Sequence, residues 1–447
     1  MPEEGEHGHM NKFKQKPSPR GTPSGLKERR DLHSPLSPRR KRQLLRGALP
    51  PQKERLTPRL WWKQNWISVL VLALAALVFA GLLWYSHQGQ IYQNQSETYK
   101  SIVYESAEVL DVLSDTVTPD RYQLEENELG QQELLIRLVT GEFRGETLQL
   151  TNHVALFYGT RMQEGDKLIV ALYISEGKIV SGNFYEYDRT PFIFVLLAIF
   201  VAVTVLVGGK TGLKSLVGLT LTVICLICIF CPLLMKGADP VFTALWLCIY
   251  VEIVCFTLLD GVNKKTVCAM LGTAAGMLLA VLFAALAQKL TRITSYSMYS
   301  TNSLVDEFRN IQQQGIPLHI HGLLSAGVVI SSLGAVMDVA MSLSSAIREL
   351  KTVNPELNRR QLWRSGMRIG RDMVGTMTNT LILAFAGSSL LLMIYLWSLE
   401  LSFYQLVGSS FLAVELISAL SSSIGVILAV PLTALVGAVF FGKSEKA

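Results

Sequence analysis

The chain has 447 residues, of which 50% are apolar and only 17% are charged, and its formal net charge is +6. Because an ordinary soluble domain carries about 25% charged residues, this composition excludes a row of soluble domains. The apolar residues collect in long runs over the second half of the chain. The sequence therefore predicts a predominantly α-helical, polytopic membrane protein with one small β-rich exported domain.

Residues 1–66 form a basic segment with 16 Lys/Arg and 6 Asp/Glu, and they show almost no apolar periodicity. A segment that cannot bury apolar surface stays disordered, so we expect a disordered cytoplasmic tail. Its densest basic run, Arg39–Arg42, is of a kind found in nucleic-acid-binding tails and beside anionic membranes. We favour anionic lipid headgroups as its partner and expect no nucleic acid.

The first apolar run, Ile67–Tyr85, is preceded by three tryptophans, which suit the headgroup level of a membrane anchor that is not cleaved. Since a span needs roughly 20 apolar residues, the sequence predicts eight spans. The last run is too long for one straight span, and we expect an interfacial half-helix to about Leu420, a break at Ser421–Ser423 and then a crossing. The seven runs after the first lie at 192–207, 216–235, 241–259, 266–287, 322–346, 373–396 and 411–441.

The distribution of charge predicts the orientation. With the tail inside, the inner segments carry a net charge of +19 and the outer segments a net charge of −9. Short inner loops of membrane proteins are enriched in Lys and Arg. We therefore expect a multi-pass protein of the cell membrane with both termini in the cytoplasm, including residues 442–447.

The segment 86–191, between the first two spans, has 17 acidic and 8 basic residues and none of the six cysteines. Val103–Leu113 is either a further strand or a short helix. Short strands separated by glycine-containing turns predict a small barrel or sandwich. This exported domain is interpreted either as a ligand- or partner-binding domain or as a structural cap. The strand-like runs are 134–139, 147–151, 154–158, 167–173 and 179–185.

Asp338 is the main candidate for a functional group inside the membrane. It lies about eight residues, or about 12 Å, from the inner end of its span. A charge in a bilayer usually faces the bundle interior or a water path, and small neighbours leave room for water. Two interpretations stay open: a proton- or cation-binding carboxylate, and a structural pair with an arginine from 364–371. The small neighbours are Ser325, Gly327, Ser331, Gly334, Ser342 and Ser345.

Four other polar residues are candidates for an ion or proton relay. Glu252 lies near the middle of its span without a basic neighbour, so burial favours its neutral form unless another helix supplies a partner. Glu415 lies four residues into the last run, where it serves the relay or only reaches the outer headgroups. Asp372 follows Arg371, a pattern that is also typical of a helix start. Asn379, two turns further along, can hydrogen-bond across helices.

Two histidines, His319 and His321, precede the sixth span. Residues i and i+2 point apart on a helix but share a face on an extended segment. We expect an interfacial pair with a gating or pH-sensing role, and a metal site is the less favoured alternative.

The inner segment 347–371 carries seven Lys/Arg and two acidic residues, interleaved with apolar residues. This pattern predicts an amphipathic helix that lies on the inner leaflet. Its expected partners are anionic lipid headgroups.

Several motifs carry a resemblance to a known family. The stretch from His319-Ile320-His321-Gly322 through Ser332–Ala340 to Ser344-Ser345, the stretch Gly366–Leu383, and the stretch Ser423–Ala434 resemble the YibE/F-like membrane proteins. Val139–Gly145 and Glu164–Asp166 are similar to the soluble part of the same family. The resemblance covers about 100–441 and implies the membrane topology more than an activity.

A second resemblance concerns mechanism. The order of span, soluble domain and spans, with Gly334-x-x-x-Asp338 in a span, is similar to the membrane half of resistance-nodulation-division and SecD/SecF-type proteins. It implies that Asp338 takes part in proton coupling, although this chain has two extra spans and one acid in place of an acidic pair.

Two functions remain from the sequence. The first is a proton- or cation-coupled transporter of unknown substrate, with Asp338 as the coupling carboxylate and Glu252 as a second relay group. The second is a non-transporting membrane scaffold or sensor whose exported domain binds a ligand or protein partner. No Ser/His, Cys/His or H-E-x-x-H pattern of a hydrolase is present, so we expect no enzyme, no cofactor and no catalytic or metal-binding residue.

Overall fold

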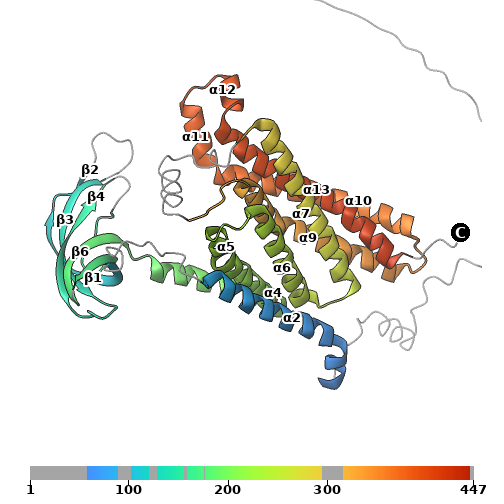
Figure 1. Cartoon of the computed structure of the whole chain (residues 1–447), viewed down its shortest axis with the longest axis horizontal. Coiled ribbons are helices and arrows are strands. Elements are labelled where there is room, and N and C mark those ends of the chain that lie inside the picture. The colour runs from blue at the N-terminus through green and yellow to red at the C-terminus, as the bar shows by residue number, and fades with distance from the viewer. Residues whose placement is uncertain are drawn as a thin grey trace, which may run out of the picture. The chain divides into compact units, whose positions relative to one another are not determined.

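The computed structural model (Figure 1) describes residues 58–88, 102–119, 128–155, 159–175, 177–293 and 316–442. It contains a small antiparallel sheet and a set of long helices. Most of the predicted basic tail and the last five residues lie outside the described part of the chain. The first helix, α2, begins at Pro58, so it includes residues that the sequence assigned to the tail.

The segment that the sequence predicts to be exported folds as a curled antiparallel sheet. The strand interpretation of 103–113 is confirmed by β1. Of the predicted run 154–158, Val154 is the last residue of β4 and Ala155 forms a bridge, while residues 156–158 lie outside the described part of the chain. The strands are β1 (Ile102–Asp115), β2 (Thr118–Pro119), β3 (Glu128–Leu138), β4 (Thr147–Val154), β5 (Lys167–Ser175) and β6 (Lys178–Tyr187).

The strand order is β2-β3-β1-β5-β6. Strand β4 lies off this path and pairs with β3. Every described pair is antiparallel, so the outer strands β4 and β6 both run in the direction of β1. Glycines with positive φ form the turns that the sequence predicted, at Gly141, Gly145, Gly165 and Gly177, because such backbone angles cost glycine little. Alternate side chains fill the core, including Leu134, Ile136, Leu138, Leu168, Val170 and Leu172.

The helices extend beyond most of the predicted spans. They are α2 (Pro58–His87), α4 (Thr190–Cys225), the π-helix η1 (Leu226–Phe230), α5 (Cys231–Met235), α6 (Pro240–Asp260), α7 (Lys264–Thr291), α9 (Leu323–Val353), α10 (Arg359–Ser388), α11 (Leu390–Ser398), α12 (Phe403–Val407) and α13 (Ser410–Phe441). By length and apolar composition, the described chain has six helices able to cross a membrane, or seven if the bent pair α10–α11 is one span.

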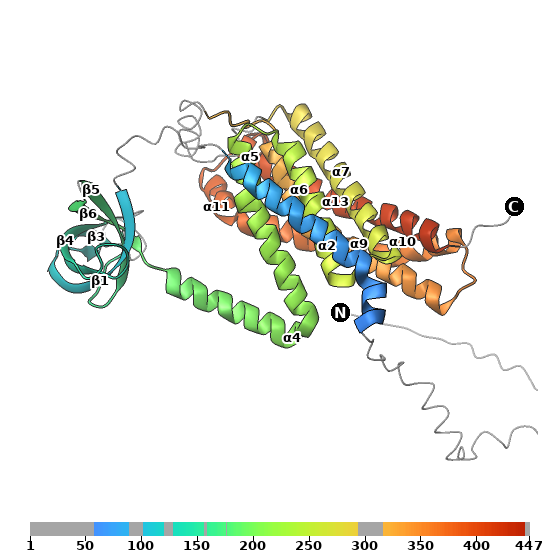
Figure 2. The same cartoon turned by 60° about the horizontal axis from the view of Figure 1, so that its bottom comes forward.

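This count differs from the predicted eight because 192–207 and 216–235 lie in one helical path, Thr190–Met235, of 46 residues. Gly209 interrupts this path with φ 54° and ψ −134°, angles that residues with a Cβ rarely adopt. Figure 2 shows α4 turning back sharply along its length. The Gly208-Gly209 pair therefore ends one apolar segment and starts the next.

Hydrogen bonds between helix ends show which loops lie at the same end of the helices. At one end, the Ser68 hydroxyl accepts from Val262 N at 2.9 Å, and Lys214 Nζ donates to Leu259 O at 3.2 Å. At the other end, the Ser86 hydroxyl donates to Cys228 O at 3.0 Å. The predicted inner segments near Ser68, Lys214 and Val262 thus meet at one end of the helices, and the predicted outer segment that begins at Ser86 lies at the other. The assignment of the first end to the cytoplasm stays a prediction.

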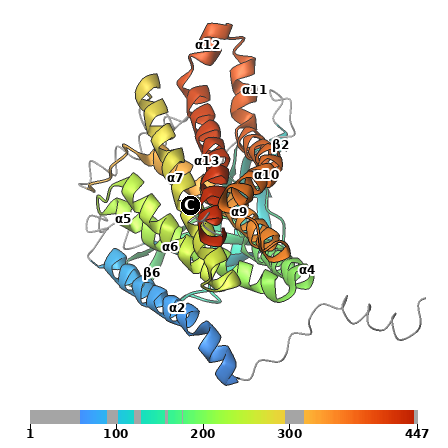
Figure 3. The same ribbon diagram turned by 90° about the vertical axis from the view of Figure 1, so that its right-hand side faces the viewer.

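Helix α13 lies in the middle of α7, α9 and α10, as the view along the helices shows (Figure 3). Small residues make this packing close. A Cβ at Gly276 of α7 would lie 2.8 Å from Ala429 Cβ and 3.0 Å from Val336 Cγ1. A Cβ at Gly370 of α10 would overlap Val430 of α13. Close packing through small residues is the usual means of helix association in membranes.

Two predictions about the C-terminal half are wrong. The break at Ser421–Ser423 is absent, because α13 is one helix from Ser410 to Phe441. The basic segment 347–371 is not a separate surface helix: α9 runs to Val353, and α10 begins at Arg359 and continues into the span. Leu362, Gly366 and Gly370 of α10 are buried, so packing on α9 and α13 holds this segment. The predicted span 373–396 is bent by 59° between α10 and α11.

Candidate functional site

Asp338 lies on the outward side of α9, within a line of small residues. We call Gly327, Ser331, Gly334, Asp338 and Ser342 the Asp338 stripe; all five are exposed in the described structure. Their spacing of three or four residues places them on one side of a helix. A Cβ at Gly327 or at Gly334 would have no neighbour within 4 Å, so no described segment covers these two positions of the stripe.

Along the helix axis, the Asp338 stripe lies about halfway between the two ends of the bundle. Ile347, nine residues beyond Asp338, packs against Gly366 near the end of the bundle that carries the basic residues. Nine residues of helix span about 14 Å, close to half of a hydrocarbon core of about 30 Å. Asp338 is therefore a carboxyl group near mid-depth, where an ionised side chain facing lipid is costly.

No hydrogen bond or ion pair reaches Asp338 within the described residues. This includes the arginines between 364 and 371, the partners of the structural interpretation. Those arginines are exposed on α10. The structural pair predicted from the sequence is therefore not formed in the described chain.

Hydroxyl groups of α13 lead from the stripe into the bundle. Ser331 Oγ and Ser422 Oγ are hydrogen-bonded at 3.2 Å. The buried hydroxyls of Ser421 and Ser423 have no hydrogen-bond partner among the described residues, and neither does Thr378 Oγ1 of α10. Buried hydroxyls normally have a partner, so these side chains are suited to bind water or a polar ligand.

Glu252 lies inside the bundle, away from the stripe. It is 1% exposed, the Thr273 hydroxyl of α7 interacts with it, and its Oε1 has no partner within the described chain. Near it, Phe256, Ala269 and Ala340 form an apolar cluster that joins α6, α7 and α9. Because no described hydrogen bond links Glu252 to Asp338, the structure does not bring these two relay candidates together.

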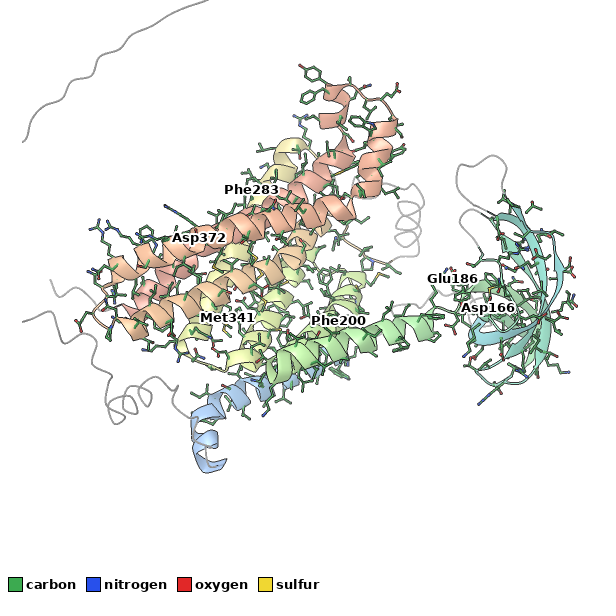
Figure 4. The ribbon with its side chains drawn as sticks, turned by 180° about the vertical axis from the view of Figure 1, so that it is seen from behind. Asp166, Glu186, Phe200, Phe283, Met341 and Asp372 are labelled. Atoms are coloured by element: carbon green, nitrogen blue, oxygen red, sulfur yellow. The ribbon has the colours of Figure 1, made fainter. Side chains whose placement is uncertain are left out.

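Asp372 and Asn379 are both exposed on α10. Figure 4 marks Asp372 on α10 and Met341 on the neighbouring α9. Glu415 is partly buried near the start of α13, and no described partner binds it. These residues lie on α10 and α13, and no described hydrogen bond or ion pair links them to Asp338.

His319 and His321 lie on an irregular segment before α9, and His321 is part of a turn. Both are exposed, whereas Leu318 and Ile320 between and beside them are buried. The described residues contain no group of three or more His, Cys, Asp or Glu able to hold a metal ion.

The segment 196–443 matches the profile of the YibE/F-like proteins. The chain belongs to the YibE/F-like family. The match includes α6 to α13 and therefore all seven candidate side chains. No curated protein matches the chain, and no solved structure does.

The YibE/F-like match begins at residue 196, beyond the sheet. The resemblance carried by Val139–Gly145 and Glu164–Asp166 thus lies outside the matched part. The family supports a membrane protein with several apolar helices, and it assigns no substrate.

The role of Ser422 and its neighbours was not predicted from the sequence. The run Ser421–Ser423 was interpreted as a helix break, although serine also occurs inside membrane helices as a hydrogen-bonding group. The signal was available in the pattern, since both this run and Ser331 lie in segments with small residues at helical spacing. Only the arrangement of α9 against α13 shows that they meet.

Proposed function

We propose that this YibE/F-like protein is a proton- or cation-coupled membrane transporter in which Asp338 is the coupling carboxylate. The observation that carries the proposal is the position of Asp338: near mid-depth, exposed along the Asp338 stripe and without a partner among the described residues. The substrate is not specified by these residues.

An ionised carboxylate in contact with lipid raises the free energy of the protein. An unpaired acid at this depth is tolerated when it is protonated or faces water. The small side chains of the stripe leave space beside it, and the hydroxyl of Ser331 continues to Ser422. A water-lined stripe would let Asp338 exchange a proton or hold a cation, which is the chemistry that coupling requires.

The energy available is sufficient for a conformational switch. Moving one elementary charge through a membrane potential of 100 mV yields about 2.3 kcal/mol. A two-state equilibrium changes by a factor of about 50 for this energy, since about 1.4 kcal/mol corresponds to tenfold. Protonation of one carboxyl can therefore bias a helix rearrangement.

The experiment is proton uptake by proteoliposomes that contain the full chain and a pH-sensitive dye. With an imposed potential or cation gradient, we expect acidification of the lumen above the rate of protein-free liposomes. Because a substrate can be required for turnover, uptake is also measured with a cell extract of small molecules in the lumen. Uptake at the protein-free rate in every condition contradicts the proposal.

The second candidate function, a membrane sensor or scaffold, is favoured by a cavity in the sheet. The cavity has a volume of about 570 Å³ and lies between β4 and β6. Its lining is mostly polar and includes the rings of His153, Phe184 and Tyr185, so it offers both hydrogen-bonding groups and aromatic surface to a small polar molecule. A sensor would show no proton uptake, so the same experiment separates the two functions. The lining residues are Gln149, Leu150, Thr151, His153, Gly159, Gly182, Asn183, Phe184 and Tyr185.

A further inference from the structure

The outward side of α10 is polar along the part that follows the buried Gly366. Arg368, Asp372, Gly375, Thr376 and Asn379 are all exposed. Their spacing of three or four residues places them in one line along the helix. We call these five residues the α10 polar face.

Other outward helix faces in the same chain are different. On α7 the exposed large side chains are Leu271, Leu278, Leu282, Leu286 and Leu290. Such a face suits lipid tails, which make no hydrogen bonds. The α10 polar face, by contrast, begins with Arg368 near the end of the bundle and continues with Asp372 and Asn379, an acid and an amide that are costly against lipid.

No described residue covers the α10 polar face. A Cβ at Gly375 would have no neighbour within 4 Å. Arg368, Asp372 and Asn379 take part in no hydrogen bond or ion pair within the described chain. Arg368 and Asp372 are one turn apart, yet they do not pair with each other in the described helix.

We propose that the α10 polar face is the contact between two copies of this chain. All copies in one membrane share an orientation, so a two-fold axis along the membrane normal places α10 parallel to its counterpart. Residues of equal number then face each other across the axis, and neighbouring residues meet reciprocally. Asn379 meets Asn379 of the second copy, a polar pair of the kind that joins membrane helices.

The α10 polar face carries one basic and one acidic side chain, so two copies of it can form ion pairs with each other. One helical turn rises about 5.4 Å, which the long side chain of arginine can span. Arg368 of each copy therefore reaches Asp372 of the other, and the dimer contains two such pairs. Gly375 and Thr376 between them are small, which permits the close approach of the two backbones.

The Asp338 stripe does not offer such a contact. Its only charged residue is an acid, so a two-fold axis through it would bring two acids together without a basic residue of the stripe to pair with them, unlike Asp372 and Arg368 on α10. The dimer contact is thus assigned to α10 and leaves the α9 stripe free. This inference rests on the membrane location of α10 and not on proton coupling.

The first test is cysteine cross-linking of the full chain in its membrane. Thr376→Cys lies on the α10 polar face, and Leu282→Cys on the apolar face of α7 is the matched control. Under mild oxidation, we expect Thr376→Cys to form the covalent dimer at least tenfold faster than Leu282→Cys, with the unsubstituted chain as the baseline for the native cysteines. Equal rates for the two variants overturn the proposal.

The second test exchanges the charges. The dimer fraction is measured by counting photobleaching steps of labelled chains diluted into lipid vesicles. We expect Arg368→Asp alone and Asp372→Arg alone each to lower the dimer fraction several-fold, and the double exchange to restore it. A monomeric wild type, or single variants that stay dimeric, overturns the proposal.

Folding and function are kept separate in these experiments. Each variant is required to elute as one species with unchanged helix content, and cross-linking at Thr376 needs no destabilising substitution. Asp338→Asn is expected to leave both readouts unchanged. A loss of proton coupling with an intact dimer, or the reverse, then shows which of the two proposals has failed.

Discussion

Replacing Asp338 by asparagine is expected to reduce proton uptake to the rate of protein-free liposomes. Asparagine keeps the size of the side chain and its capacity for hydrogen bonds, but it cannot release a proton. Because Asp338 has no partner among the described residues, the change breaks no described contact. The fold should therefore be retained, and the loss of uptake should be at least tenfold.

Glu252→Gln and Glu415→Gln are the matched controls for this substitution. Glu252 is buried apart from the stripe, and no described hydrogen bond connects it to Asp338. We expect both variants to keep most of the uptake, and Asp338→Glu, which restores a carboxyl group, to keep part of it. If Asp338→Asn transports normally while folded, Asp338 is not the coupling group.

The substitution Gly276→Val is expected to have the largest effect on stability. Its first side-chain atom would lie 2.8 Å from Ala429 Cβ, 3.0 Å from Gly425 O and 3.0 Å from Val336 Cγ1. These neighbours belong to α13 and α9, so the new methyl groups would separate three helices. Overpacking of this kind typically costs up to about 3 kcal/mol.

Unfolding in mixed micelles with increasing denaturing detergent measures this cost. The control is Gly81→Val on α2, where a Cβ would have no neighbour within 4 Å and where the change in helix propensity is the same. We expect the transition of Gly276→Val to move clearly to lower detergent and that of Gly81→Val to stay near the wild type. Equal transitions would show that α7, α9 and α13 do not pack as described.

Local patterns predicted much of the fold. The turn glycines of the sheet were recognisable because positive φ favours glycine, as at Gly141 and Gly165. The apolar runs placed most helices correctly, since a long apolar run specifies a helix within a bilayer. The family was also predictable, because its motifs lie in the segment that the profile matches.

The exact course of the chain from 192 to 235 was only partly predictable. Its two apolar runs were interpreted as separate spans, and the backbone does break between them, at Gly209, but helix α4 extends up to the break from both sides. Similarly, polar residues such as Ser421–Ser423 looked like a break, but inside a bundle they can hydrogen-bond to a neighbour without ending the helix. Hydropathy measures how polar a side chain is, but it does not show whether the side chain faces lipid, water or a neighbouring helix.

Of the candidate site, the sequence predicted only the central residue, Asp338. Depth along the span identified Asp338, but depth does not reveal which side of a helix is covered. The exposure of the stripe, the burial of Glu252 and the contact between Ser331 and Ser422 depend on how α6, α9 and α13 pack. Arg368 was assigned to a surface helix because the continuous packing of α10 with α9 and α13 is a tertiary property.

The central claim is that water reaches the Asp338 stripe, and thiol accessibility tests it most directly. In a chain with Cys228 and Cys231 replaced by alanine, a charged, membrane-impermeant maleimide is applied to membranes that carry Ser342→Cys or Ser331→Cys. Leu282→Cys on the apolar face of α7 is the control, because a thiol in lipid stays protonated and unreactive. We predict that the stripe variants react at least tenfold faster than the control, and reaction no faster than Leu282→Cys would contradict the account.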